Sequence, residues 1–162
     1  MTVKLRNMAS LYIRRGTQYL LLYRIGSRVI PPSWCGIGGH FEENELNEPE
    51  KAMLRELEEE IGLTEHALTN IRLRYVTFRL KNGEIRQNYY YFADLREDMF
   101  IHMECDEGEL EWIDADALPF DKMPHTAKYV MRHYMDVGKS NDMLYAGTAV
   151  DGDVIFHALV EF

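Results

Sequence analysis

Cysteine, positive charge and long hydrophobic runs are all scarce in this sequence, and each scarcity excludes a class of protein. Only Cys35 and Cys105 are present among 162 residues, which is too few for a disulfide framework, and no histidines accompany them at zinc spacing. The longest apolar run is far too short to span a membrane. The first twenty residues also lack the apolar core and cleavage site of a signal peptide. We therefore expect a cytoplasmic protein with free thiols and no membrane partner.

The charge balance argues against a nucleic-acid polymer as partner. Lys and Arg total 18 and Asp and Glu total 27, so the formal net charge is −9. Binding to duplex nucleic acid requires clustered cations that displace counterions. A phosphate-bearing small substrate remains compatible, because a bound metal ion reverses the local sign of the charge. Hydrophobic residues (46%) and charged residues (28%) are near globular averages, so we expect one domain over residues 1–162.

Apolar patterning and turn residues predict a strand-rich chain with two helices. The helices are expected over 48–61 and 125–137. Hairpin signals stand at Arg15-Gly16-Thr17, Asn82-Gly83 and Asp151-Gly152-Asp153. The strands are expected over 8–13, 19–23, 71–80, 84–93, 110–113, 144–150 and 154–160. Because strands and helices do not alternate, we expect an α+β fold with a mixed sheet.

The helix predicted over 48–61 has recognisable start and stop signals. Asn47 is the expected cap, and Glu50 stands at the position that completes a capping box. Pro49 fits the first turn, and Gly62 can end the helix in a left-handed conformation. The helical spacing of four apolar residues predicts the buried stripe, namely Met53, Leu54, Leu57 and Ile61.

Three glutamates on this helix form a pattern that suits a divalent metal. Glu56, Glu59 and Glu60 stand at i, i+3 and i+4, so they share one face. Mg²⁺ prefers oxygen ligands and is often shared with substrate phosphates. The Gly38-Gly39 loop just ahead permits close backbone approach and can offer a carbonyl ligand. Taken alone, however, the three glutamates fit a solvated acidic face better than a metal site.

The complete sequence motif favours a metal site over a solvated acidic face. Gly39 followed by Arg55-Glu56-Leu57-Glu58-Glu59-Glu60-Ile61-Gly62-Leu63 resembles the Nudix box, G-x5-E-x7-R-E-U-x-E-E-x-G-U, where U is aliphatic. The box would span 39–63, and its second half matches at every specified position. The first half is two residues longer than the pattern. Its first glutamate falls on Glu45 when counted from Gly39 and on Asn47 when counted back from Arg55.

Resemblance to the Nudix (MutT-like) hydrolases implies an α/β/α sandwich around a mixed sheet and a hydrolase of phosphoric anhydride bonds that uses Mg²⁺ or Mn²⁺. It implies that the metal is held by Glu59, Glu60 and the Gly38 carbonyl. Glu56 would be a further ligand or the base that activates water, and Arg55 would hold the carboxylates by ion pairing. Many members add an acidic residue from a later loop. The candidates here are Asp106, Glu107 and Glu109, of which we favour Glu107.

Three further residues are candidates for substrate binding. Trp34 either stacks on a nucleobase or braces its loop. His40 follows the glycine pair and is placed to touch phosphate. Tyr90 belongs to a run of aromatic residues that alternate between the faces of a strand, so it either lines a base pocket or packs in the core.

The expected reaction converts a nucleoside diphosphate or triphosphate derivative to a nucleoside monophosphate. By resemblance to Nudix members that carry an apolar residue before the glycine pair, the Ile37-Gly38-Gly39 loop leads us to expect an oxidised purine triphosphate such as 8-oxo-dGTP. The alternatives are an ADP-ribose or nucleotide-sugar pyrophosphatase and a non-catalytic nucleotide sensor. We expect a monomer or homodimer. Residues 139–162 carry no chemical motif, and they complete the sheet, line the base pocket or pair with another subunit.

Overall fold

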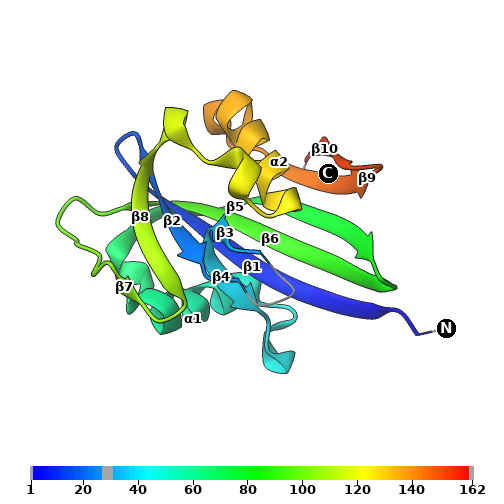
Figure 1. Cartoon of the computed structure of the whole chain (residues 1–162), viewed down its shortest axis with the longest axis horizontal. Coiled ribbons are helices and arrows are strands. Elements are labelled where there is room, and N and C mark those ends of the chain that lie inside the picture. Colours follow the sequence, from blue (N-terminus) through cyan, green and yellow to red (C-terminus); the bar gives the residue numbers. More distant parts are fainter. Residues whose placement is uncertain (1, 27–30, 161–162) are drawn as a thin grey trace.

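The computed structural model describes residues 2–26 and 31–160 (Figure 1). Its two α-helices are α1 (Pro49–Ile61) and α2 (His125–Asp136). Its strands are β1 (Lys4–Arg15), β2 (Gln18–Arg24), β3 (Ser33–Cys35), β4 (Ile37–His40), β5 (Leu68–Lys81), β6 (Glu84–Leu95), β7 (Glu104–Cys105), β8 (Gly108–Asp114), β9 (Leu144–Val150) and β10 (Asp153–Leu159). The short 3₁₀ turns include η1 (Glu43–Glu45) and η5 (Gly138–Ser140).

All ten strands belong to one mixed sheet, which confirms the predicted sheet type. The main order is β10-β9-β5-β6-β1-β2-β8-β7, with β3 paired to β2 and β4 paired to β1. The β1–β6 and β5–β9 pairs are parallel and the other pairs are antiparallel. The β5–β6 turn has positive φ at Asn82 (53°) and Gly83 (72°), as the Asn-Gly hairpin signal predicts.

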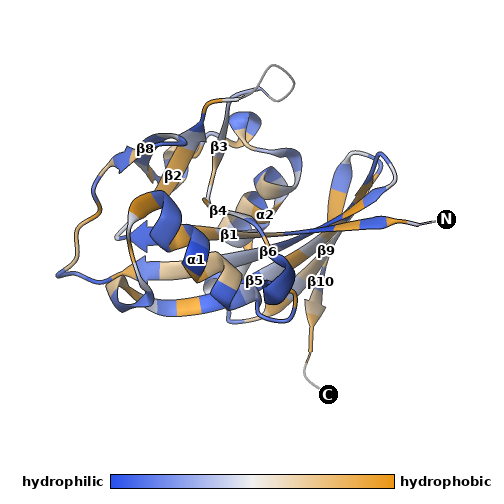
Figure 2. Ribbon diagram, turned by 90° about the horizontal axis from the view of Figure 1, so that it is seen from below, coloured by the Kyte–Doolittle hydropathy of each residue, from blue (hydrophilic) through white to orange (hydrophobic). Residues whose placement is uncertain are grey.

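The two faces of the sheet carry separate hydrophobic cores. Successive side chains of β1 point to opposite faces, so Leu11 packs with α1 whereas Tyr12 packs on the side of α2. The helices therefore cover opposite faces, and the α/β/α sandwich is confirmed (Figure 1). Figure 2 shows hydrophilic and hydrophobic segments side by side along α1, as expected of a helix with one buried face.

The start of α1 corrects one prediction. The helix begins at Pro49 after Glu48, and no side chain caps it, so Asn47 is not the cap. The backbone turns through η1 just before, and the Glu48 N–H is already bonded to the Glu45 carbonyl (2.8 Å). The end of the helix agrees with expectation, because Gly62 is left-handed (φ 68°) and donates to the Glu58 carbonyl.

The C-terminal segment completes the sheet. Strand β9 lies parallel to β5, and Tyr145 is the register partner of Tyr75. Their rings stack with centroids 5.4 Å apart. Of the three roles considered for residues 139–162, the described part, through residue 160, shows the first. None of the helices in the described ranges is long and apolar enough to cross a membrane.

Candidate active site

The glycine pair lets the backbone of β4 approach both β1 and α1 closely. Gly38 has φ 151°, and a Cβ there would lie 1.9 Å from the Ala9 carbonyl oxygen. A Cβ on Gly39 would meet the Glu56 carboxylate at 2.6 Å. Gly38 therefore needs glycine, whereas a side chain at Gly39 would displace the Glu56 carboxylate. Strand β4, which the sequence patterns did not predict, thereby lies directly against the acidic face of α1.

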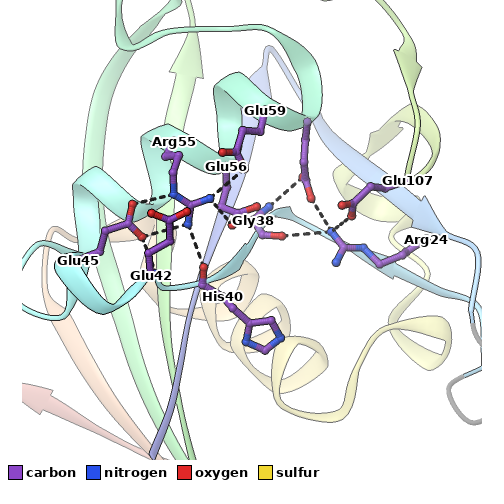
Figure 3. A network of polar contacts seen from close by, with 10 residues as sticks. Arg24, Gly38, His40, Glu42, Glu45, Arg55, Glu56, Glu59 and Glu107 are labelled. Atoms are coloured by element: carbon purple, nitrogen blue, oxygen red, sulfur yellow. Dashed lines mark hydrogen bonds and ion pairs between the residues drawn. The ribbon is translucent and has the colours of Figure 1, made fainter.

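Arg55 gathers the first group of carboxylates (Figure 3). Its guanidinium donates to both oxygens of Glu45, from Nε at 2.7 Å and from Nη2 at 3.0 Å. Its Nη1 lies 2.9 Å from carboxylate oxygens of both Glu56 and Glu59. The side chain of Glu45 is only 2% exposed, so this is a buried bidentate ion pair. The first glutamate of the Nudix box is found at Glu45 when the pattern is counted from Gly39, and this is the residue that pairs with Arg55. The alternative position, Asn47, is not.

Arg24 gathers a second group, and the sequence analysis did not single it out. Its Nη2 lies 3.1 Å from the Gly38 carbonyl, 2.7 Å from Glu60 Oε1 and 3.0 Å from Glu107 Oε2. The other Glu60 oxygen accepts from the Gly38 N–H at 3.1 Å. Figure 3 shows Gly38 in the network of Arg24 and Glu107, and the carboxylates of Glu45, Glu56 and Glu59 in the network of Arg55. Arg24 ends an apolar strand just ahead of the glycine-rich loop. This position is the sequence feature that could have identified it as a site residue.

Of the later acidic residues, Glu107 is the one that reaches this network. It lies in the turn between β7 and β8. Strand β8 pairs with β2, which brings the turn beside Arg24. In the part of the chain that the structure describes, Asp106 and Glu109 make no ion pair with Arg24.

Burial raises the pKa values of two of these carboxyls. The pKa of Glu60 is raised to about 8, chiefly by burial, and Arg24 and the Gly38 N–H lower it only in part. Burial also raises the pKa of Glu56, against the opposing effect of Arg55. The hydrogen bond to Glu45 is the largest cause of the raised pKa of Arg55. The site therefore combines desolvated carboxylates with permanent cations, an arrangement typical of functional sites.

A cavity of about 350 Å³ adjoins the second network on the α2 side of the sheet. Two of the predicted substrate-binding residues, His40 and Tyr90, line it. Trp34 does not, and its ring instead packs against Tyr23 with centroids 4.9 Å apart. The other lining residues are Arg6, Met8, Ser10, Tyr12, Arg24, Ser33, Cys35, Gly36, Gly38, Arg79, Arg86, Asn88, Pro124, His125, Thr126 and Ala127.

The donor atoms at the second network fit a cation. Within the described ranges, no three His, Cys, Asp or Glu side chains form a ready-made metal-binding group. The two arginines stand between the carboxylates instead. Yet three oxygens, from Gly38, Glu60 and Glu107, already surround the single cationic nitrogen Arg24 Nη2. All three are hard oxygen donors, the type that Mg²⁺ and Mn²⁺ prefer.

Comparison with known proteins identifies the family. The family model described as NUDIX domain matches residues 4–134, which is most of the chain. The chain belongs to the Nudix family. As a Nudix hydrolase it acts on pyrophosphate bonds, and its substrates are small nucleotides. No curated protein matches the sequence.

Solved structures share the Nudix fold. The mutator MutT protein from Bacillus halodurans is 22% identical with a TM-score of 0.64, covering 94% of this chain and 97% of that one. A MutT Nudix hydrolase from Burkholderia pseudomallei is 26% identical with a TM-score of 0.63, covering 80% and 97%. An Ap4A hydrolase from C. elegans is 18% identical with a TM-score of 0.65, covering 86% and 100%.

Proposed function

We propose that this Nudix hydrolase is a Mg²⁺-dependent pyrophosphohydrolase that releases a nucleoside monophosphate. The observation that carries the proposal is the convergence of three oxygens, from Gly38, Glu60 and Glu107, on Arg24 Nη2 beside a cavity. A cation is already stabilised at this point, and the cavity offers room for a nucleotide next to it.

In this proposal Glu59, Glu60 and the Gly38 carbonyl hold Mg²⁺, or Mn²⁺ in its place, and Glu56, the further candidate ligand, acts as the base. When bound, the metal neutralises charge that develops on the phosphoryl oxygens during cleavage. Binding requires an ionised Glu60, and its raised pKa means that metal competes with a proton there. The Gly38 N–H fixes the Glu60 carboxylate toward the Gly38 carbonyl.

Glu56 is proposed as the base that takes the proton from the attacking water. Its carboxylate lies against the backbone of Gly39, and its pKa is raised by burial, which makes it a stronger base. Arg55 is a positioning residue, because it holds Glu56 and Glu59 at 2.9 Å while it is itself fixed by Glu45.

The proposal is tested by turnover of a nucleotide panel with Mg²⁺ and with a chelator. We expect Mg²⁺-dependent turnover, a fall of roughly 10²–10⁴-fold for Glu56→Gln, and a higher Mg²⁺ requirement for Glu60→Gln. Glu58→Gln is the matched control, because Glu58 is exposed on the same helix. Turnover that survives chelation, or that falls equally in the control, would contradict the proposal.

The panel also decides the substrate class. It contains 8-oxo-dGTP, unmodified dNTPs, ADP-ribose, a nucleotide sugar and a dinucleoside polyphosphate. The Ile37-Gly38-Gly39 loop supports an oxidised purine triphosphate such as 8-oxo-dGTP, and β4 retains this loop beside the cavity. Preferred hydrolysis of ADP-ribose or the nucleotide sugar would favour the alternative pyrophosphatases.

A further inference from the structure

Three arginines form a row across the sheet at one end of the cavity. Arg6 on β1 is the register partner of Arg86 on β6, and Arg86 is the partner of Arg79 on β5. All three line the cavity on the α2 side. Like charges directly opposite one another destabilise a sheet. The arginine row therefore lowers the stability of the sheet by electrostatic repulsion, and a bound anion would offset this repulsion.

Protein groups offset this charge only in part. The Glu84 carboxylate lies 3.1 Å from Arg86 and 3.8 Å from Arg6. Arg79 makes no ion pair with any acidic residue in the described part of the chain. Among the described residues that line the cavity, none is acidic. The arginine row therefore leaves a net positive potential in the cavity of a protein whose overall charge is −9.

The first turn of α2 adds to this potential from the opposite wall. Residues 124–127 line the same cavity, and no side chain caps the helix. The first backbone N–H groups of a helix carry partial positive charge and bind anions. His125 lies in this turn, and burial, Arg79 and Lys128 all lower its pKa. The arginine row and the helix terminus therefore present positive charge to one space.

This positive end lies well away from the carboxylates. Gly38 is the register partner of Ser10, and Arg6 lies four residues from Ser10 along β1. At the usual rise of a strand this separation is roughly 13 Å. Two unsatisfied polar atoms line the space between the ends. By the geometric criteria for a hydrogen bond, the buried Tyr12 hydroxyl and Asn88 Oδ1 have no partner among the residues that the structure describes.

We propose that the arginine row binds a second phosphoryl group of the substrate, remote from the anhydride that is cleaved. This inference rests on the proposed function, because it takes the carboxylate end as the cleavage site. The uncharged part of the substrate lies between the ends, where Tyr12 and Asn88 offer hydrogen bonds. Among the substrates open to the proposed function, the arginine row therefore favours nucleotides phosphorylated at both ends or bridged by a long polyphosphate over a nucleoside triphosphate such as 8-oxo-dGTP.

Matched ligand pairs that differ by phosphoryl groups test this assignment. NADPH against NADH, and coenzyme A against 3′-dephospho-coenzyme A, probe a terminal phosphomonoester. Diadenosine tetraphosphate against diadenosine diphosphate probes a longer polyphosphate. Binding is measured by calorimetry on the Glu56→Gln variant with Mg²⁺, so that turnover does not interfere. We expect about tenfold tighter binding of the more phosphorylated member in at least one pair.

Variants show whether the arginine row causes the preference. The Arg79→Gln/Arg86→Gln double variant should bind both members of the pair equally, whereas Arg79→Lys should retain part of the preference. Arg96→Gln is the control, since this exposed arginine pairs with Asp98 outside the cavity. Melting temperatures establish that each variant is folded. Removing like charges from neighbouring strands should not lower them.

Equal binding in every pair, or a preference that survives in the folded double variant, would overturn the assignment. Its failure is distinct from failure of the proposed function. If turnover depends on Mg²⁺ but binding shows no preference for the more phosphorylated ligand, only the proposed role of the arginine row is rejected. If binding prefers the more phosphorylated ligand through the arginines but no turnover depends on Mg²⁺, only the proposed pyrophosphohydrolase activity is rejected.

Discussion

Individual arginines keep the acidic residues of this site in place. Arg55 holds Glu45, Glu56 and Glu59, while Arg24 holds Glu60 and Glu107. Carboxylates crowded on one helix face repel one another, and a buried one also loses its hydration. The two guanidiniums offset part of both costs within the chain itself. The site can thus be built by folding, before any substrate arrives.

His133 is a single residue that makes the stability of the fold depend on pH. Its Nδ1 lies 2.8 Å from the Tyr75 hydroxyl, and its ring packs on Tyr145 and Phe156. Burial lowers its pKa below the usual 6.5, although Asp136 raises it slightly. The unfolded state therefore binds a proton more readily, so this contribution to stability is present above pH 6.5 and is lost as the pH falls toward the folded-state pKa.

We expect His133→Gln to flatten the dependence of unfolding free energy on pH between about 5 and 7, because glutamine does not titrate there. Chemical denaturation at several pH values measures the slope. His66→Gln, which replaces a histidine at an exposed position, is the matched control. If both variants kept the original slope, His133 would not be its source.

At the scale of elements, η1 connects the glycine loop to α1 through one buried carboxylate. Glu45 accepts two hydrogen bonds from Arg55 and one from the Glu42 N–H at 2.9 Å. The two extra residues ahead of Arg55, relative to the Nudix pattern, are thus accommodated without loss of this ion pair. No side chain caps α1, and this ion pair ties η1 to the helix instead.

Glu45→Gln should therefore lower the unfolding free energy by about 1–3 kcal/mol, because it removes a charged partner from a buried network. It should also lower turnover, since Arg55 would no longer be fixed opposite Glu56. Asn47→Ala is the matched test of the alternative position and should change stability by less than about 0.5 kcal/mol. Urea denaturation compares the two variants, and the opposite ranking would refute the assignment.

For the whole molecule, the C-terminal hairpin is part of the second core. Tyr75 is completely buried, and both Tyr145 on β9 and Phe156 on β10 pack against its ring. Strand β9 also covers the edge of β5. The family match ends at residue 134, so this hairpin lies beyond the part that the family model describes.

A chain that ends at residue 138 should consequently fail to fold into a soluble protein. It would expose the aromatic core under α2 and leave β5 as a long unpaired edge, which favours aggregation. Soluble yield and circular dichroism measure the outcome. A chain that ends at Leu159 keeps both strands of the hairpin and serves as the control. A folded, soluble chain of 138 residues would show that the first core suffices.

Local signals in the sequence predicted most of the fold. The Asn82-Gly83 turn, the left-handed Gly62 and the amphipathic spacing of both helices depend on neighbours a few residues away. The strands that were missed, β3, β4 and β7, are two to four residues long. Such short strands have no periodicity of their own, because they form only by pairing with β2, β1 and β8.

The sequence by itself determined the family and the acidic face of α1, because the spacing of Glu56, Glu59 and Glu60 is a property of one helix. Only the tertiary structure decided that Glu45 meets Arg55 and that Arg24 joins Glu60 to Glu107. It also decided that Arg6, Arg79 and Arg86 stand in one row. The Asn82-Gly83 turn sets the register of Arg79 with Arg86, but the pairing of β1 with β6 and the contacts of Arg24 join residues far apart in the chain, which local patterns do not bring together.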